Sequence, residues 1–165
     1  MSVTQQVESI CRAAHDAQYA LAGASAEDKN KMLRAIAKAI SGASGQLLEI
    51  NKKDVEEAKA SGMSFAMVDR LTLTPERISV MAEGVAQVAD LPDPVGEVTE
   101  EWTVPSGLHI KKVRVPLGVI GVIYESRPNV TADVAALCLK SGNCVVLRGG
   151  KDAINSNRAI YNIIV

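Results

Sequence analysis

Residues 115–151 read VPLGVIGVIYESRPNVTADVAALCLKSGNCVVLRGGK and alternate between apolar and polar segments. The almost continuously apolar run from Val119 to Tyr124 predicts a strand buried on both faces, as in a parallel sheet. A second apolar run, from Cys144 to Leu147, predicts a second buried strand. Between them, apolar residues recur at helical spacing, and Gly142 stands where a helix would end. Those helical apolar residues are Val130, Val134, Leu137 and Cys138. The stretch therefore predicts an α/β fold built on a strand–helix–strand unit.

Two polar turns follow the two predicted strands. Parallel strands joined by a right-handed crossover end at the same sheet edge, and open α/β sheets bind their ligands at that edge. The first turn carries Glu125, Ser126, Arg127 and Asn129, and the second carries Arg148, Gly149, Gly150 and Lys151. Three cations and two glycines at one edge indicate a ligand that bears phosphate. The alternative is that the turns are solvated loops without a binding role.

The Gly-Gly-Lys sequence of the second turn does not belong to a P-loop. Asp152 stands where a P-loop requires Ser or Thr, and Cys144 and Val145 occupy the region of its first glycine. The chain also lacks a Gly-x-Gly-x-x-Gly fingerprint. A nucleotide-binding protein of the P-loop class is therefore set aside.

The composition excludes several classes of function. A chain of 165 residues is long enough for one domain with a substantial core. Its net charge of −1 and its 3% of aromatic residues argue against a nucleic-acid surface. No apolar run approaches the roughly 20 residues of a membrane span, and the N-terminus does not resemble a secretory signal. Cys11, Cys138 and Cys144 lack metal-site spacing, so we expect a cytoplasmic protein without a metal.

The first 96 residues predict a series of amphipathic helices that serve as packing elements. Ser25 and Thr74 have the character of helix N-caps, and Pro75 suits the first helical position. The expected helices run over 3–22, from Ser25 to Gly42, over 47–51, from Asp54 to Gly62, and from Thr74 onward. Residues 152–165 predict a further helix.

A proline-rich connector, Leu91 to Gly96, marks the clearest boundary in the chain. The segments 98–104 and 108–115 then alternate imperfectly around the turn Pro105-Ser106-Gly107, which predicts a β-hairpin. We therefore divide the chain into 1–96, 97–114 and 115–165. The hairpin could form an edge of the main sheet or a separate arm.

Three stretches resemble the γ-glutamyl phosphate reductases, a branch of the aldehyde dehydrogenase superfamily. They are residues 116–131, 137–151 and 69–77. The resemblance covers nearly the whole chain and implies an aldehyde-dehydrogenase-like fold: N-terminal helices, the first portion of a Rossmann-like nucleotide-binding sheet and a β-hairpin arm. An arm with exposed strand edges requires a partner strand, so we expect homo-oligomers. Because the family's enzymes are much longer and the chain stops at Val165 without a helix cap, we expect the N-terminal portion of such an enzyme.

The resemblance implies the reduction of L-glutamyl 5-phosphate by NADPH to glutamate 5-semialdehyde and phosphate, a step of proline biosynthesis. The small-molecule substrate would react with a cysteine thiolate. That cysteine lies beyond the strand–helix–strand unit in the family, and Cys11, Cys138 and Cys144 each fit a structural role better. We therefore expect the fragment alone to be inactive. The alternative function is a truncated, non-catalytic interaction or assembly module.

The resemblance also implies which residues hold the cofactor. In aldehyde dehydrogenases a basic residue at the end of the second strand contacts the adenosine ribose or its phosphate, and Arg148 matches that place. Lys151 stands where NAD-using relatives commonly have a glutamate, which favours NADPH because a carboxylate would repel the 2′-phosphate. The expected cofactor-binding residues are Arg148, Gly149, Gly150, Lys151, Ser126 and Arg127. Ser126 and Arg127 could instead face the substrate phosphate.

Asn129 is the candidate for oxyanion stabilisation. In the superfamily an asparagine just after the first strand donates its amide to the oxygen that becomes negatively charged. The local pattern here is Glu-Ser-Arg-Pro-Asn, where the superfamily usually has Pro-Trp-Asn. The alternative role of Asn129 is to cap the helix that follows.

Overall fold

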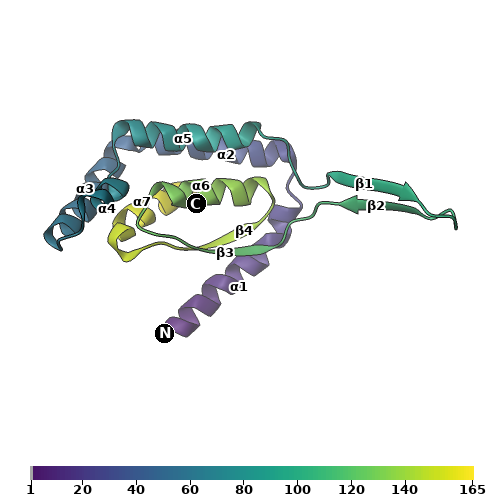
Figure 1. Cartoon of the computed structure of the whole chain (residues 1–165), viewed down its shortest axis with the longest axis horizontal. Coiled ribbons are helices and arrows are strands. Elements are labelled where there is room, and N and C mark those ends of the chain that lie inside the picture. Colours follow the sequence, from purple (N-terminus) through teal and green to yellow (C-terminus); the bar gives the residue numbers. More distant parts are fainter. Residues whose placement is uncertain (1) are drawn as a thin grey trace.

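The computed structural model describes residues 2–165 and has a layered helix–sheet architecture with a projecting hairpin (Figure 1). The elements are α1 Val3–Ala22, α2 Ala26–Gly42, α3 Ser44–Ala60, α4 Phe65–Leu71, α5 Pro75–Asp90, β1 Val98–Thr103, β2 His109–Val113, β3 Val119–Ile123, α6 Asn129–Lys140, β4 Cys144–Arg148, the 3₁₀ helix η1 Lys151–Ala153 and α7 Ile154–Ile164. Helices α6 and α7 lie between the β3–β4 sheet and the outer pair α2 and α5. None of the helices in residues 2–165 combines the length and apolar character that a bilayer crossing needs.

The strand–helix–strand prediction is confirmed. Strands β3 and β4 pair in parallel, with Ile123 opposite Arg148, so both strands end at one edge. Helix α6 ends at Lys140, and Gly142, two residues further on, has a φ of 71° that suits glycine. The N–H of Asn143 donates to the carbonyl of Cys138 at 2.8 Å, and the N–H of Gly142 donates to that of Leu139 at 3.1 Å. These two bonds form a Schellman motif and turn the chain directly into β4.

The predicted burial of β3 on both faces is wrong for this chain. Ile123 is 86% exposed, and Gly121 is exposed as well. Strand β3 is poorly covered because α1 and α6 contact mainly β4, and because β4 is its one partner strand in residues 2–165. Within residues 2–165, part of the apolar surface of β3 therefore remains exposed.

The inward face of α6 also differs from the predicted one. Leu137 is 54% exposed, although its spacing predicts burial. The buried residues of α6 are Thr131, Ala132, Ala136, Cys138 and Lys140. Small side chains dominate because α6 is packed on one side by β4 and on the other by α5, α2 and α7. Close packing of three helices around α6 favours alanine over leucine on this face.

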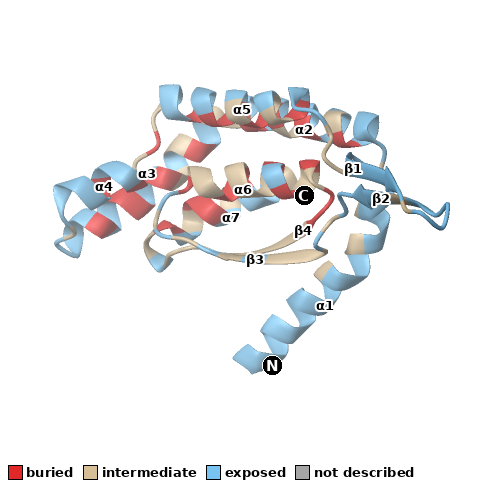
Figure 2. Ribbon diagram, turned by 45° about the vertical axis from the view of Figure 1, so that its right-hand side comes forward, coloured by how far each residue is buried: buried red, intermediate tan, exposed pale blue. Residues whose placement is uncertain are grey.

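The main core lies between the helix layers, and buried residues line the inner faces of α2 and α5 (Figure 2). Leu33, Ile40, Leu47, Val85 and Ile160 are each fully buried there. The predicted N-caps are confirmed: the Ser25 side chain accepts from the N–H of Asp28, and the Thr74 side chain accepts from that of Arg77. Both caps start the long helices that form the outer layer.

Residues 44–60 form one helix, so the predicted division into a helix at 47–51 and another from Asp54 is wrong. Asp54 is 1% exposed and accepts hydrogen bonds from Asn155 and Ser156 at the start of α7. Asp54 therefore caps the start of α7 and does not begin a helix of its own. Helix α1 contains no buried residue, and Val7 and Ile10 on its predicted packing face are exposed.

The predicted hairpin is confirmed, and within residues 2–165 it is separate from the β3–β4 sheet. Strands β1 and β2 pair antiparallel, with Trp102 opposite Ile110. Glu97 and Arg114 continue the pairing toward the base, where the N–H of Arg114 donates to the carbonyl of Glu97 at 2.9 Å. The hairpin thus leaves the body of the molecule as an arm-like projection (Figure 1).

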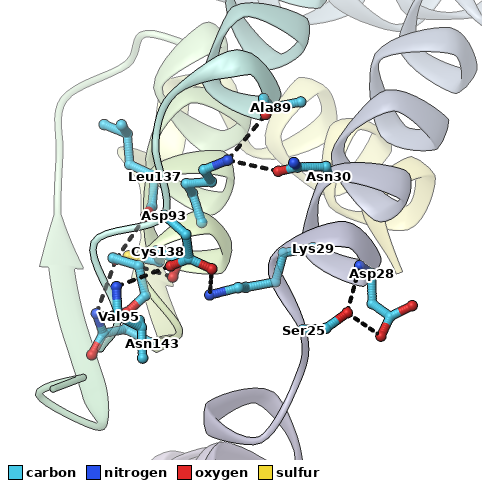
Figure 3. Close-up of polar contacts among 12 residues, drawn as sticks. Ser25, Asp28, Lys29, Asn30, Ala89, Asp93, Val95, Leu137, Cys138 and Asn143 are labelled. Atoms are coloured by element: carbon cyan, nitrogen blue, oxygen red, sulfur yellow. Dashed lines mark hydrogen bonds and ion pairs between the residues drawn. The ribbon is translucent and has the colours of Figure 1, made fainter. Parts of the chain in front are cut away.

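A buried charged cluster holds the connector from which the hairpin starts (Figure 3). Lys29 on α2 is 1% exposed, and its Nζ lies 2.5 Å from Asp93 Oδ2. Asp93 Oδ1 accepts from the N–H of Val95 at 3.0 Å. Nearby, the buried Lys140 donates to Asn30 Oδ1 at 2.6 Å and to the carbonyl of Ala89 at 3.0 Å. The cluster therefore joins α2, α6 and the C-terminal end of α5 to the connector.

Candidate functional site

The two polar turns meet at the carboxyl edge of the sheet, as the strand–helix–strand unit predicts. The N–H of Tyr124 donates to the carbonyl of Arg148 at 3.1 Å, which extends the ladder by one bond past the strands. Ser126 Oγ then donates to Asp152 Oδ2 at 3.1 Å. We call this edge, formed by residues 124–129 and 148–152, the rim.

The two glycines of the rim allow the turns to approach each other closely. A Cβ atom on Gly149 would overlap Asn157 Nδ2 and lie 2.9 Å from Tyr124 Cζ. A Cβ atom on Gly150 would lie 2.5 Å from Ser126 Oγ and 3.1 Å from its backbone nitrogen. Any larger residue would force the turns apart, so the glycines set the shape of the rim.

Substitution of Gly149 by alanine is expected to lower the free energy of unfolding by about 1–3 kcal/mol, because the new methyl group overlaps Asn157 and Tyr124. Urea unfolding followed by circular dichroism measures the change. Gly121→Ala is the matched control, since a Cβ on Gly121 would have no atom within 4 Å. Equal stability of the two variants would contradict the close approach.

The cations of the rim are not neutralised by ion pairs within the described chain. Arg127, Arg148 and Lys151 are exposed, and residues 2–165 offer none of them a carboxylate partner. The Arg148 guanidinium donates to the carbonyl of Gly149, which directs it along its own turn. Exposed cations at a sheet edge, beside glycines that open the backbone, suit an anionic group such as a phosphate. The residues present therefore fit a ligand that carries a phosphate group.

Asn129 is the first residue of α6, and its side chain does not cap the helix. Pro128 occupies the N-cap position, so the alternative role of Asn129 as an N-cap is wrong. Asn129 Nδ2 donates to Asp133 Oδ2 at 2.9 Å. Burial raises the pKa of the Asp133 carboxyl, and the hydrogen bond from Asn129 opposes that shift only in part. The second amide hydrogen of Asn129 is available to another acceptor.

A polar chain beneath the rim was not predicted. The hydroxyl of Tyr124 lies 2.6 Å from Thr131 Oγ1, which donates to Asn157 Oδ1 at 3.2 Å. Asn157 Nδ2 is buried and has no hydrogen-bond partner among residues 2–165. These hydrogen bonds tie the end of β3 to α6 and α7 below the site. The members of the polar chain lie on three elements and share no local sequence signal.

The second unpredicted feature is a cleft of about 600 Å³ between α5 and α6, beside the rim. Its lining comes from two sequence segments, 69–84 and 127–133. The first includes residues 69–77, which in the sequence stood out only through their resemblance to a family. We call this feature the α5–α6 cleft. Its size is within the usual range of about 300–1,000 Å³ for small-molecule sites.

The cysteines do not supply an activated nucleophile near the rim. Burial raises the pKa of the Cys138 thiol, with a smaller contribution from Cys144, and burial raises that of Cys144 as well. Both thiols are therefore protonated at neutral pH, which makes them poor nucleophiles. Cys11 is exposed on α1, outside the rim.

Comparison with known proteins finds matches to one protein family and to enzymes of one name within it. The sequence model of the aldehyde dehydrogenase family matches residues 2–164. The γ-glutamyl phosphate reductase of Rhodopseudomonas palustris is 55% identical over 154 residues, which cover 93% of this chain and 36% of the relative. That of a Geobacter species is 52% identical over 164 residues, covering 99% and 39%. The crystal structure of the Thermotoga maritima enzyme of that name has a TM-score of 0.88 at 46% identity, covering 92% of this chain and 36% of that chain.

These matches confirm the predicted fold class and the resemblance carried by residues 116–131 and 137–151. The chain spans 36–39% of the length of the curated relatives that it matches.

Proposed function

The chain belongs to the aldehyde dehydrogenase family, and on that premise we propose that it forms a portion of an enzyme that reduces L-glutamyl 5-phosphate. The products would be glutamate 5-semialdehyde and phosphate, in proline biosynthesis in the cytoplasm. The observation that carries this proposal is the identity of 52–55% to enzymes named γ-glutamyl phosphate reductase. The uncompensated cations of the rim support it, because both the substrate and the proposed cofactor carry phosphate.

We propose that NADPH binds along the rim. Arg148 and Lys151 would attract the 2′-phosphate, while Gly149 and Gly150 keep the backbone free of side chains there. Ser126 and Arg127 would contact either the cofactor or the substrate phosphate from the first turn. When bound, NADPH supplies the hydride for the reduction.

Asn129 would stabilise the oxygen that becomes negatively charged during acyl transfer, through the amide hydrogen that Asp133 does not use. We assign the nucleophile to none of the cysteines of this chain: Cys138 and Cys144 lie at the end of the β3–β4 ladder opposite the rim and have raised pKa values, and Cys11 lies on α1. It follows that the isolated chain is expected to bind NADPH but to show no reductase activity.

Substitution of Arg148 by alanine is expected to weaken NADPH binding by about 10- to 100-fold, with a smaller effect on NADH, because a charged contact to the 2′-phosphate is lost. Fluorescence titration of both nucleotides measures the two affinities. Arg34→Ala is the control, since Arg34 is exposed and pairs with Asp90 on the outer helices. Unchanged NADPH affinity in Arg148→Ala would exclude this cofactor assignment.

The second candidate function is an assembly module without catalysis. It is favoured by the hairpin, whose two strands pair only with each other in residues 2–165 and so leave backbone groups open to a partner strand. Residues 97–114 would then form the arm of a homo-oligomer, between the helical segment 1–96 and the cofactor-binding segment 115–165. Stable oligomers in sedimentation experiments together with absent NADPH binding would favour this candidate.

A further inference from the structure

The α5–α6 cleft brings together two segments that are about 50 residues apart in the sequence. Residues 69–77 approach from the end of α4 and the start of α5, and residues 127–133 approach from the rim and α6. The complete lining is Asp69, Arg70, Thr72, Leu73, Glu76, Arg77, Val80, Met81, Gly84, Arg127, Asn129 and Asp133. The cleft therefore opens next to the rim and shares Arg127 and Asn129 with it.

The charges of the cleft differ in how far they are satisfied. Arg77 is fully engaged: it donates to both carboxylate oxygens of Asp69 and to the carbonyls of Asp69 and Thr72. Arg127 and Asp133, in contrast, have no oppositely charged partner in residues 2–165. Asp133 Oδ2 accepts from Asn129, and Oδ1 is left without a protein donor there. Glu76 also lacks an ion pair among the described residues, but it is exposed, whereas Asp133 is partly buried. A cation and a partly buried carboxylate without ion-pair partners thus line one cleft.

We propose that the α5–α6 cleft binds the α-amino-acid end of the substrate, with the α-ammonium group on Asp133 and the α-carboxylate on Arg127. This inference rests on the proposed function, because it names the end of a glutamyl substrate that the cleft recognises. It replaces the contact of Arg127 with the cofactor or the substrate phosphate by a contact with the α-carboxylate, and leaves the contact from the first turn to Ser126. Arginine suits a carboxylate because its guanidinium can donate two parallel hydrogen bonds.

The other walls of the cleft agree with this occupant. Leu73 and Met81 are almost completely buried and present apolar surface, which suits the methylene groups between the two ends of a glutamyl chain. The lining contains three acidic and three basic side chains, so its formal charge is balanced. A balanced cleft with unpaired charges of both signs favours a zwitterion over a simple aliphatic aldehyde.

The state of Asp133 supports the same occupant. Burial raises the pKa of its carboxyl because no cation compensates the loss of water. An ammonium group at Oδ1 would provide that compensation, and the hydrogen bond from Asn129 already fixes the orientation of the carboxylate. Asn129 therefore acts here as a positioning residue for Asp133.

Three small molecules test the proposal on the 165-residue chain by NMR titration. L-Glutamate carries both head groups, glutarate lacks the ammonium, and 4-aminobutyrate lacks the α-carboxylate. We expect L-glutamate to bind at least about tenfold more tightly than either analogue, since each loses one charged hydrogen-bonded contact. The shifted amide signals should belong to the cleft segments 69–84 and 127–133.

Two variants separate the contacts. Asp133→Asn is expected to weaken L-glutamate binding about tenfold and to leave glutarate binding unchanged, which removes the discrimination between the two. Arg127→Gln is expected to remove the discrimination between L-glutamate and 4-aminobutyrate in the same way. Glu56→Gln on α3 and Arg34→Gln on α2 are matched controls outside the cleft. The amide spectrum of each variant checks its fold. If Asp133→Asn does not fold, the Arg127→Gln variant still tests the proposal.

The outcomes distinguish this proposal from the proposed function. If the chain binds NADPH in an Arg148-dependent way but does not prefer L-glutamate to its analogues, the cleft assignment is overturned while the cofactor assignment stands. If L-glutamate is preferred but NADPH does not bind, the cleft assignment holds and the cofactor assignment fails. Absence of L-glutamate binding at millimolar concentration, or equal losses in the control variants, would also overturn the cleft assignment.

Discussion

Substitution of Asp54 by alanine is expected to lower the free energy of unfolding by about 3–5 kcal/mol, because it removes a buried carboxylate that joins two helices. The Asp54 carboxylate accepts from Asn155 Nδ2 at 2.7 Å, from the N–H of Ser156 at 2.8 Å and from Ser156 Oγ at 2.6 Å. A weaker bond of 3.4 Å comes from the N–H of Asn155. Since Ser156 is completely buried, its donors could not turn to water after the substitution.

The position of Asp54 explains why so large an effect is expected. Helix α7 starts at Ile154 without a side-chain cap of its own, so Asp54 of α3 supplies both the acceptor and the negative charge that a helix N-terminus favours. Its neighbour Asn51, one turn earlier, donates to Ser156 Oγ at 3.0 Å and to the carbonyl of Leu71 at 2.9 Å. The two residues therefore hold α3, α4 and α7 together.

Urea unfolding followed by circular dichroism measures the effect of Asp54→Ala. Asp54→Asn retains one acceptor oxygen and should lose less stability than the alanine variant. Glu57→Ala, at an exposed position of the same helix, should change the free energy of unfolding by no more than about 0.5 kcal/mol. The interpretation fails if Asp54→Ala and Glu57→Ala are equally stable.

Substitution of Lys29 by methionine is expected to cost a similar amount, about 3–5 kcal/mol at neutral pH, because it leaves the Asp93 carboxylate without its cation. The side chain of Lys29 is 2% exposed and that of Asp93 is 15% exposed, so water screens the pair little. The Lys29→Met, Asp93→Asn double variant should recover much of the loss, since asparagine still accepts from the N–H of Val95 and carries no charge.

The effect of Lys29→Met should depend on pH. Burial by itself raises the pKa of Asp93, but the hydrogen bonds from Lys29 and from the Val95 N–H outweigh it, so the pKa lies below its ordinary value of 3.8. A lowered folded-state pKa contributes stability that is fully present above the unfolded pKa and is lost as the pH falls through the folded one. The difference between wild type and variant should therefore be largest at neutral pH and shrink below about pH 4.

Unfolding free energies measured at neutral pH and at successively lower pH test this dependence. A difference that stays constant across the range would show that the lost packing of the lysine stem, and not the ion pair, is responsible. Because the cluster holds the connector at residues 91–96, loss of order in the hairpin of Lys29→Met is a further expected result.

The sequence by itself determined the features that depend on neighbouring residues. The strand–helix–strand unit, the caps at Ser25 and Thr74, and the turn at Gly142 follow from local spacing and from side chains that bond within a few residues. The location of the rim follows as well, because parallel strands of one crossover must end at the same edge. The same reasoning places the residues proposed to hold NADPH at that edge, whereas their assignment to NADPH came from the resemblance to the family.

The tertiary structure alone decided what depends on distant partners. Asp54 looks like a helix start in the sequence, yet it lies inside α3. The helix start to which it contributes is that of α7, about 100 residues away. The exposure of Ile123 depends on how many strands lie beside it, and the charge of the buried Lys29 is tolerated only because Asp93 folds back onto it. The α5–α6 cleft likewise exists only where residues 69–84 meet residues 127–133. Local pattern carries no information about such pairings, since the free energy that selects them comes from burial and contact in the folded chain.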